Sequence, residues 1–110
     1  MIPQTNRIAE LNDQLRTTFL TGKVLLTPGM AGLEPEDRET ILSTVRGFSD
    51  FDEDNDPHGE HDFGCVTQPG VGKVFWKIDY YDTEYQYGSS DPANPALTRR
   101  VLTIMLAGEY

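Results

Sequence analysis

The sequence predicts an α+β protein, a two-layer domain in which a small sheet is covered by helices. Apolar residues recur at three- and four-residue spacing near the N-terminus and again after Pro35, which indicates amphipathic helices. Residues 63–81 alternate apolar and polar side chains on both sides of a Pro-Gly turn, which indicates a β-hairpin. A chain of 110 residues has room for one such domain, residues 1–110.

The N-terminal half predicts two helices with a strand between them. A first helix is expected over residues 6–18, with an apolar face of Ile8, Leu11, Leu15 and Phe19. Residues 23–27 are mainly aliphatic and lie between Gly22 and a Pro-Gly pair, so a short buried strand is expected there. Proline suits the first position of a helix and acidic residues suit its first turn, so Pro35 should begin a second helix that ends near Gly47.

The C-terminal half predicts the hairpin and a last helix. The hairpin strands are expected at residues 63–68 and 73–81, and residues 85–87 are expected to add a short edge strand. Asn94-Pro95 indicates a helix start, and the inner face of that helix would carry Leu97, Val101, Leu102 and Met105. The expected order is α-β-α-β-β-(β)-α, with three helices and a mostly antiparallel sheet of three or four strands. Arg99 and Arg100 would lie at the start of the last helix and pair with acidic neighbours.

Composition and charge exclude several classes of protein. A net charge of −9 repels nucleic acid and anionic lipid, so neither direct nucleic-acid binding nor membrane binding is expected. No apolar run is long enough to cross a bilayer, and no secretory signal is recognisable. The one cysteine, Cys65, excludes an intramolecular disulfide and fits a reducing cytoplasm. We therefore expect a cytoplasmic protein, either a monomer or a homodimer formed through a free sheet edge or exposed tyrosines.

An acidic loop, residues 49–62, is the most informative segment for function. It lies between Arg46 and Lys73, a stretch without lysine or arginine, and holds seven carboxylates within thirteen residues: Asp50, Asp52, Glu53, Asp54, Asp56, Glu60 and Asp62. Like charges this close repel one another, and solvent and salt reduce this cost without abolishing it. A cationic partner is therefore expected. It could be a basic protein surface, a metal ion, or water and counterions alone.

Metal binding is the alternative interpretation of the same segment. The alternating aspartates from Asp50 to Asp56 suit a hard cation, but an EF-hand loop starting at Asp50 would require glycine and glutamate where the chain has Asn55 and His61. Zinc or a non-haem metal could use three ligands of suitable type, His58, His61 and Cys65, although their spacing matches no familiar site. Equally, the histidines and carboxylates could bond the loop's own backbone.

No catalytic residue is assigned from the sequence, and no cofactor is expected. Cys65 beside a histidine meets only the residue-type requirement of nucleophilic catalysis. The glycines of residues 68–72 join two strands, where turn chemistry explains them. The protein is therefore expected not to be an enzyme.

Three segments, residues 55–64, 75–82 and 91–110, resemble a family of small bacterial proteins that is classified as a domain of unknown function. The resemblance extends from Ile8 to Tyr110. It carries no activity and no catalytic residues. It implies a genetic context instead, because such proteins are often encoded on plasmids and other mobile elements beside antirestriction-type genes.

These observations predict a non-catalytic acidic binding protein that inhibits a defence system, as an anti-CRISPR or antirestriction protein. Carboxylates of the acidic loop would take the place of DNA phosphates on the basic nucleic-acid-binding surface of a protein complex. Exposed tyrosines would add apolar contacts, and three further residues could extend the acidic strip: Asp79, Asp82 and Glu84. A small structural or regulatory domain with a merely solvated acidic loop is the third hypothesis.

Overall fold

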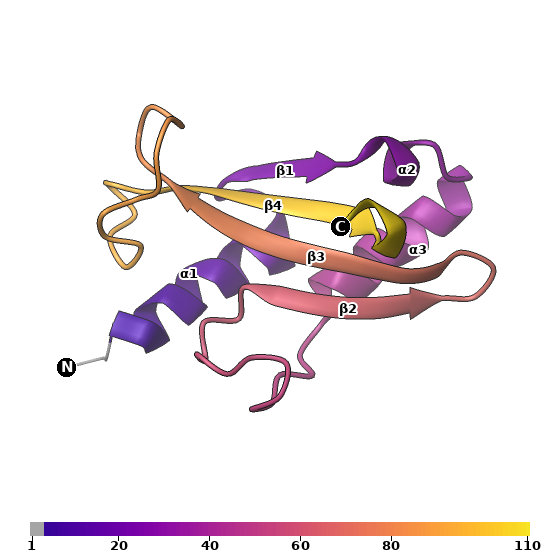
Figure 1. Ribbon diagram of the computed structural model, residues 1–110, viewed down its shortest axis with the longest axis horizontal. Coiled ribbons are helices and arrows are strands. Elements are labelled where there is room, and N and C mark those ends of the chain that lie inside the picture. Colours follow the sequence, from indigo (N-terminus) through magenta and orange to yellow (C-terminus); the bar gives the residue numbers. More distant parts are fainter. Residues whose placement is uncertain (1–3) are drawn as a thin grey trace.

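The computed structural model describes residues 4–110, which form one mixed sheet with helices on one side of it (Figure 1). The described elements are, in chain order, α1 Gln4–Thr18, β1 Lys23–Leu26, α2 Pro28–Ala31, α3 Pro35–Arg46, β2 Phe63–Gln68, β3 Gly72–Tyr81, β4 Arg99–Leu106 and the 3-10 helix η1 Ala107–Glu109. The predicted α+β class is confirmed. None of the helices in the described part of the chain is long and apolar enough to cross a membrane.

The sheet has the strand order β1-β4-β3-β2. The pairs β2–β3 and β3–β4 are antiparallel, whereas β1 runs parallel to β4. Side chains from α1, α2 and α3 pack against one face of the sheet and form a single core of Leu15, Met30, Ile41, Val45, Val66, Val74, Trp76, Ile78, Leu102 and Ile104. The opposite face carries an aromatic group in which the rings of Phe63, Phe75 and Tyr110 lie 5.4–5.9 Å apart.

Five of the predicted helices and strands are present. The helix expected over residues 6–18 is α1, which begins slightly earlier. The strand expected over residues 23–27 is β1, but its expected burial is wrong, because β1 is an edge strand with no buried residue. The second helix is α3, with Pro35 in its first turn and Gly47 at its C-cap. The expected hairpin is β2 and β3. Each of these elements places apolar residues on one face at its own period, so burial of that face selects the element.

Trp76 is the largest fully buried side chain, and the chain leaves space for it at Gly64. These residues are directly opposite one another in the β2–β3 pair. A Cβ atom at Gly64 would lie 2.4 Å from Trp76 Nε1, so a side chain at this position would displace the indole. The rings of Phe48 and Phe51 meet Trp76 nearly edge-on, at centroid distances of 5.5 and 6.1 Å.

The prediction of a helix after Asn94-Pro95 is wrong, because residues 99–106 form β4, an inner strand of the sheet. Leu102 and Ile104 face the helices, and Val101 and Met105 on the other face are also nearly inaccessible. A strand buried on both faces lacks the alternation of a half-buried strand, so its apolar run resembles the broad face of a buried helix.

Two shorter segments also differ from the sequence-based prediction. Residues 85–87 form no strand: beyond β3 only an isolated bridge joins Tyr81 to Gly88. Tyr85 has a positive φ of 57°, which interrupts extended backbone. The short helix α2 was not expected, because Pro28-Gly29 is also typical of a turn.

Candidate functional site

Aromatic contacts hold the acidic loop against the core. The ring of Phe51 stacks on that of His61 with a centroid distance of 4.0 Å and an interplanar angle of 2°. The guanidinium of Arg16 lies 5.2 Å from the ring centroids of both Phe51 and Trp76, and it donates to the carbonyl oxygen of Phe48 over 2.9 Å. The loop therefore leaves α3 along a fixed path (Figure 1).

Two of the predicted site residues are used inside the loop. The Asp52 carboxylate accepts hydrogen bonds of 2.9 Å from the backbone N–H groups of Asp54 and Asn55. The buried Asp56 carboxylate accepts from the backbone N–H of His61 at 3.2 Å. These bonds shape turns, as short polar side chains commonly do, so Asp52 and Asp56 act first as structural residues.

Glu60 and Asp62 lie at the base of the loop and are partly buried. Glu60 accepts a hydrogen bond of 3.0 Å from the Tyr80 hydroxyl, which accepts one of 2.8 Å from the side-chain amide of Asn12. Burial raises the pKa of Tyr80, so the phenol stays protonated and donates to Glu60. Burial and the neighbouring charge of Glu60 also raise the pKa of Asp62.

Replacement of Asp62 by asparagine is expected to stabilise the protein at neutral pH. A carboxyl group whose pKa is raised by folding binds its proton more tightly in the native state than in the unfolded state. Its ionisation therefore lowers the free energy of unfolding as the pH rises above its pKa in the unfolded state. The gain in stability should disappear below pH 3.8, the ordinary pKa of an aspartate, because the carboxyl group is then protonated in both the native and the unfolded state. Urea unfolding of both proteins across this range measures it, with the exposed Asp54→Asn as a control that should change stability little. A less stable Asp62→Asn protein at neutral pH would contradict the prediction.

Three exposed carboxylates of the loop have neither a cationic partner nor a hydrogen bond within the described residues, whereas that of the exposed Asp52 is hydrogen-bonded. Asp50, Glu53 and Asp54 are exposed, and within the described residues no lysine, arginine or histidine nitrogen lies within 4.0 Å of their carboxylates. Asn55 fixes the backbone around them, because its side chain donates to the carbonyl of Asp50 at 2.7 Å and accepts from the N–H of Asp52 at 2.9 Å. These three residues are the part of the acidic loop that is available to a partner.

The three residues expected to extend the strip lie outside the acidic loop. Asp79 is on β3 and forms an ion pair with Lys77, with an N–O distance of 2.9 Å. Asp82 accepts from the backbone N–H groups of Glu84 and Gln86, and Glu84 is exposed. Asp82 and Glu84 belong to the segment between β3 and β4, which is well separated from the acidic loop (Figure 1).

The structure does not gather the candidate metal ligands. Within residues 4–110, no group of three or more His, Cys, Asp or Glu side chains is arranged to hold a metal ion. His58 is exposed, and Cys65 is exposed on β2. The Nδ1 atom of His61 lies 3.0 Å from an oxygen of Asp13, and the ring is stacked as described above.

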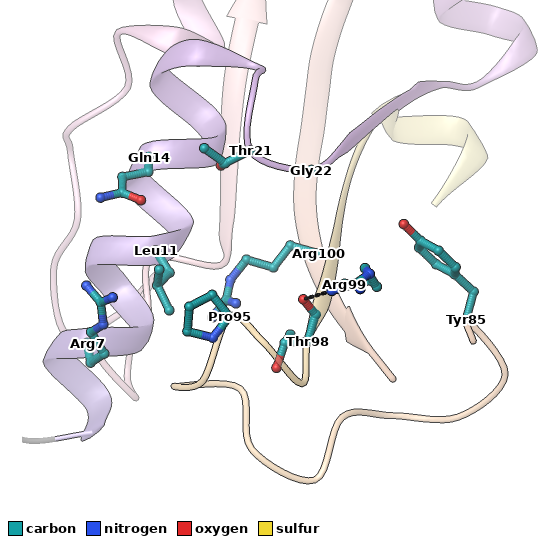
Figure 2. Close-up of a pocket in the computed structure, with 10 residues that line it drawn as sticks. All are labelled: Arg7, Leu11, Gln14, Thr21, Gly22, Tyr85, Pro95, Thr98, Arg99 and Arg100. Atoms are coloured by element: carbon teal, nitrogen blue, oxygen red, sulfur yellow. Dashed lines mark hydrogen bonds between the residues drawn. The ribbon is translucent and has the colours of Figure 1, made fainter. Parts of the chain in front are cut away.

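A pocket of about 310 Å³ lies between α1 and the first residues of β4, on the side of α1 that faces residues 95–98 (Figure 2). Its lining includes three arginines and no acidic residue: Arg7, Leu11, Gln14, Thr21, Gly22, Tyr85, Pro95, Thr98, Arg99 and Arg100. Arg100 reaches from β4 toward α1, whereas Arg99 lies on the side of Tyr85 (Figure 2). We call this the arginine pocket.

Arg100 is held rigidly in this pocket by uncharged groups. The residue is 5% exposed, its Nε donates to Asn12 Oδ1 over 2.7 Å, and a terminal nitrogen donates to the carbonyl of Pro92. Its guanidinium lies 5.1 Å from the centroid of the Tyr80 ring. Burial lowers the pKa of Arg100, and the positive charge of Arg7 acts in the same direction.

The expected pairing of Arg99 and Arg100 with acidic neighbours is wrong. No carboxylate of the described chain lies within 4.0 Å of either guanidinium. The prediction placed both residues on a helix, whereas consecutive strand residues point to opposite faces. Two adjacent arginines in so acidic a chain were the signal that could have found the pocket.

The fold and these sites define a small α+β protein with an exposed acidic loop and a separate arginine-lined pocket. Residues 26–109 match the model of a family described as Protein of unknown function (DUF3768), and the chain belongs to this family. No curated protein and no solved structure matches the chain.

Proposed function

We propose that the protein acts by binding, without catalysis, and that its acidic loop occupies the basic nucleic-acid-binding surface of a cytoplasmic defence complex. The observation that carries the proposal is the exposure of Asp50, Glu53 and Asp54 on an anchored loop, with no cation of the described chain beside them. Lysines and arginines that hold DNA phosphates would bind these carboxylates equally well.

Anchoring makes the loop suited to this role. A flexible acidic segment would lose conformational entropy when it binds, and that loss would reduce its affinity. Here the loop is already held by the stacked Phe51–His61 pair and by the bonds of Asn55. The net charge of −9 would also accelerate encounter with a basic surface, and the association should weaken as salt rises.

Under this proposal, six of the ten candidate residues have different roles. Asp50, Glu53 and Asp54 would contact the partner, and Asp52 and Asp56 would shape the loop. Asp79 would contribute little, because it is paired with Lys77. The choice of a restriction or CRISPR complex as the partner rests on the resemblance described above, whose implied context is bacterial mobile elements carrying antirestriction-type genes.

The test is an affinity capture with charge variants. The protein is immobilised and exposed to lysate from cells that carry restriction and CRISPR systems, and bound proteins are identified at low and high salt. We expect a DNA-binding complex that is released by salt and displaced by DNA. The triple variant Asp50→Asn, Glu53→Gln, Asp54→Asn should lose most of this capture.

The matched control is Glu34→Gln, Glu36→Gln, Glu39→Gln, which removes the same charge from exposed positions at and in α3. It should keep most of the capture. Equal loss in both triple variants would show that net charge alone is responsible. Capture that survives in the loop variant would refute the role of the loop.

A further inference from the structure

We propose that the arginine pocket is a binding site for a phosphate group, either free or as a monoester of a small molecule. This site is separate from the acidic loop and does not depend on the function proposed for it. The pocket is concave, and three arginines contribute to its lining.

The distribution of charge is the first argument. The chain has 18 acidic and 9 basic residues, yet three of the basic residues and none of the acidic ones line this pocket. An acidic protein repels anions in general, so a concentration of arginine without carboxylates creates a local exception. Of the three arginines, only Arg7 forms an ion pair among the described residues, with Glu10 outside the lining, over 3.2 Å between two exposed side chains, and such a surface pair contributes little.

The burial of Arg100 is the second argument. A buried charge is costly unless a countercharge and hydrogen bonds compensate it. Arg100 has the hydrogen bonds, but their acceptors are the neutral oxygens of Asn12 and Pro92. The charge of Arg7 opposes that of Arg100, and Glu60 favours it only from beyond 4.0 Å. An anion in the pocket would place a negative charge in direct contact with the guanidinium.

The remaining lining suits a small organic phosphate. Arginine binds phosphate through two parallel N–H bonds, which a lysine cannot provide. Gln14, Thr21 and Tyr85 bring further polar groups, while Leu11 and Pro95 supply apolar surface. A volume of about 310 Å³ is at the lower end of small-molecule sites, so the site fits a phosphate with a modest organic group.

The experiment is a ligand titration at low ionic strength, in which binding is measured by calorimetry and by changes in the amide NMR chemical shifts. The probes are inorganic phosphate, adenosine monophosphate, adenosine and succinate. We expect saturable binding of the phosphate compounds, with shifts centred on β4 and α1, and no binding of adenosine. Equal affinity for both phosphates would identify the free anion as the ligand, and tighter binding of the monoester would identify an organic phosphate.

Variants assign the binding to the pocket. Arg7→Gln and Arg99→Gln should each weaken binding about tenfold, because a charge-assisted hydrogen bond is lost. Arg100 is left intact, since it also holds Asn12. The control Lys73→Gln removes the same charge at the far, exposed end of β3.

Four outcomes of the titrations and of the control variant would overturn the proposal. They are the absence of saturable binding by either phosphate, equal binding of adenosine, tighter binding of succinate, and equal weakening by Lys73→Gln. Thermal unfolding of each variant separates a binding defect from a folding defect. Retained phosphate binding in both folded arginine variants would likewise refute the assignment.

Discussion

Replacement of Trp76 by alanine is expected to lower the free energy of unfolding by about 3–5 kcal/mol, the usual cost of deleting a buried indole. The side chain is completely inaccessible and is the largest in the core. It packs against Gly64, against the rings of Phe48 and Phe51, and against the Arg16 guanidinium. Small domains have about 5–15 kcal/mol of stability in total, so the variant should be close to unfolding.

Denaturant unfolding followed by circular dichroism measures this loss. The neighbouring Phe75→Ala is the control, because Phe75 lies on the opposite face of β3 and is only partly buried. It should cost clearly less than Trp76→Ala. A larger loss for Phe75→Ala would mean that the main core lies on the other side of the sheet.

The same substitution connects the core with the acidic loop. Phe48 and Phe51 both contact Trp76, and both belong to the segment that carries the chain from α3 into the loop. Loss of the indole should therefore loosen the loop before it unfolds the sheet. Hydrogen exchange of the loop amides, compared between Trp76→Ala and Phe75→Ala, would detect this difference.

The sequence predicts α1, α3 and the hairpin because each is amphipathic at its own period. The prediction fails at residues 99–106 because β4 is an inner strand and is buried on both faces. In such a strand neighbours in space, not the local pattern, decide the structure. Asn94-Pro95 strengthened the error, since turn residues and helix caps use the same chemistry: the Asn94 side chain accepts from the N–H of Ala96 in a turn.

The acidic loop could be located from the sequence, but the roles of its residues could not. Residues close along the chain stay close in space, so the concentration of charge survives any fold. Whether a carboxylate points outward depends on tertiary contacts, as with Asp56, which is buried beneath His61. The adjacent Arg99 and Arg100 mark one wall of the arginine pocket in the sequence, but the whole pocket could not be predicted, because it joins them to Arg7 across most of the chain's length.

One buried residue connects the two sites. Asn12 is fully inaccessible and donates to the backbone carbonyl of Glu60 at 2.9 Å and to the Tyr80 hydroxyl. Its side-chain oxygen accepts the hydrogen bond from Arg100. A single amide thus orients the base of the acidic loop and one wall of the arginine pocket, so an Asn12 variant would disturb both and cannot serve as a test of either alone.

Replacement of Arg16 by alanine is expected to lower the free energy of unfolding by about 3 kcal/mol. The substitution leaves an empty volume beside Trp76 and a carbonyl of Phe48 without its hydrogen-bond donor. The Arg16 side chain is nearly inaccessible and donates to Asp13 at 2.8 Å as well as to Phe48. Arg16→Met should recover part of this stability, because its side chain refills the volume between Phe51 and Trp76 without restoring the hydrogen bonds.

Arg38→Ala is the matched control for Arg16. Arg38 also donates to two backbone carbonyls, those of Ala31 and Leu33, but it is partly exposed, so water can replace its bonds. Arg38→Ala should therefore lower the free energy of unfolding by only about 1 kcal/mol. If Arg16→Ala cost no more than Arg38→Ala in denaturant unfolding, burial of the Arg16 guanidinium would not be what anchors the acidic loop. The loop's exposed carboxylates would then owe their position to the Phe51–His61 stack and to the hydrogen bonds within the loop.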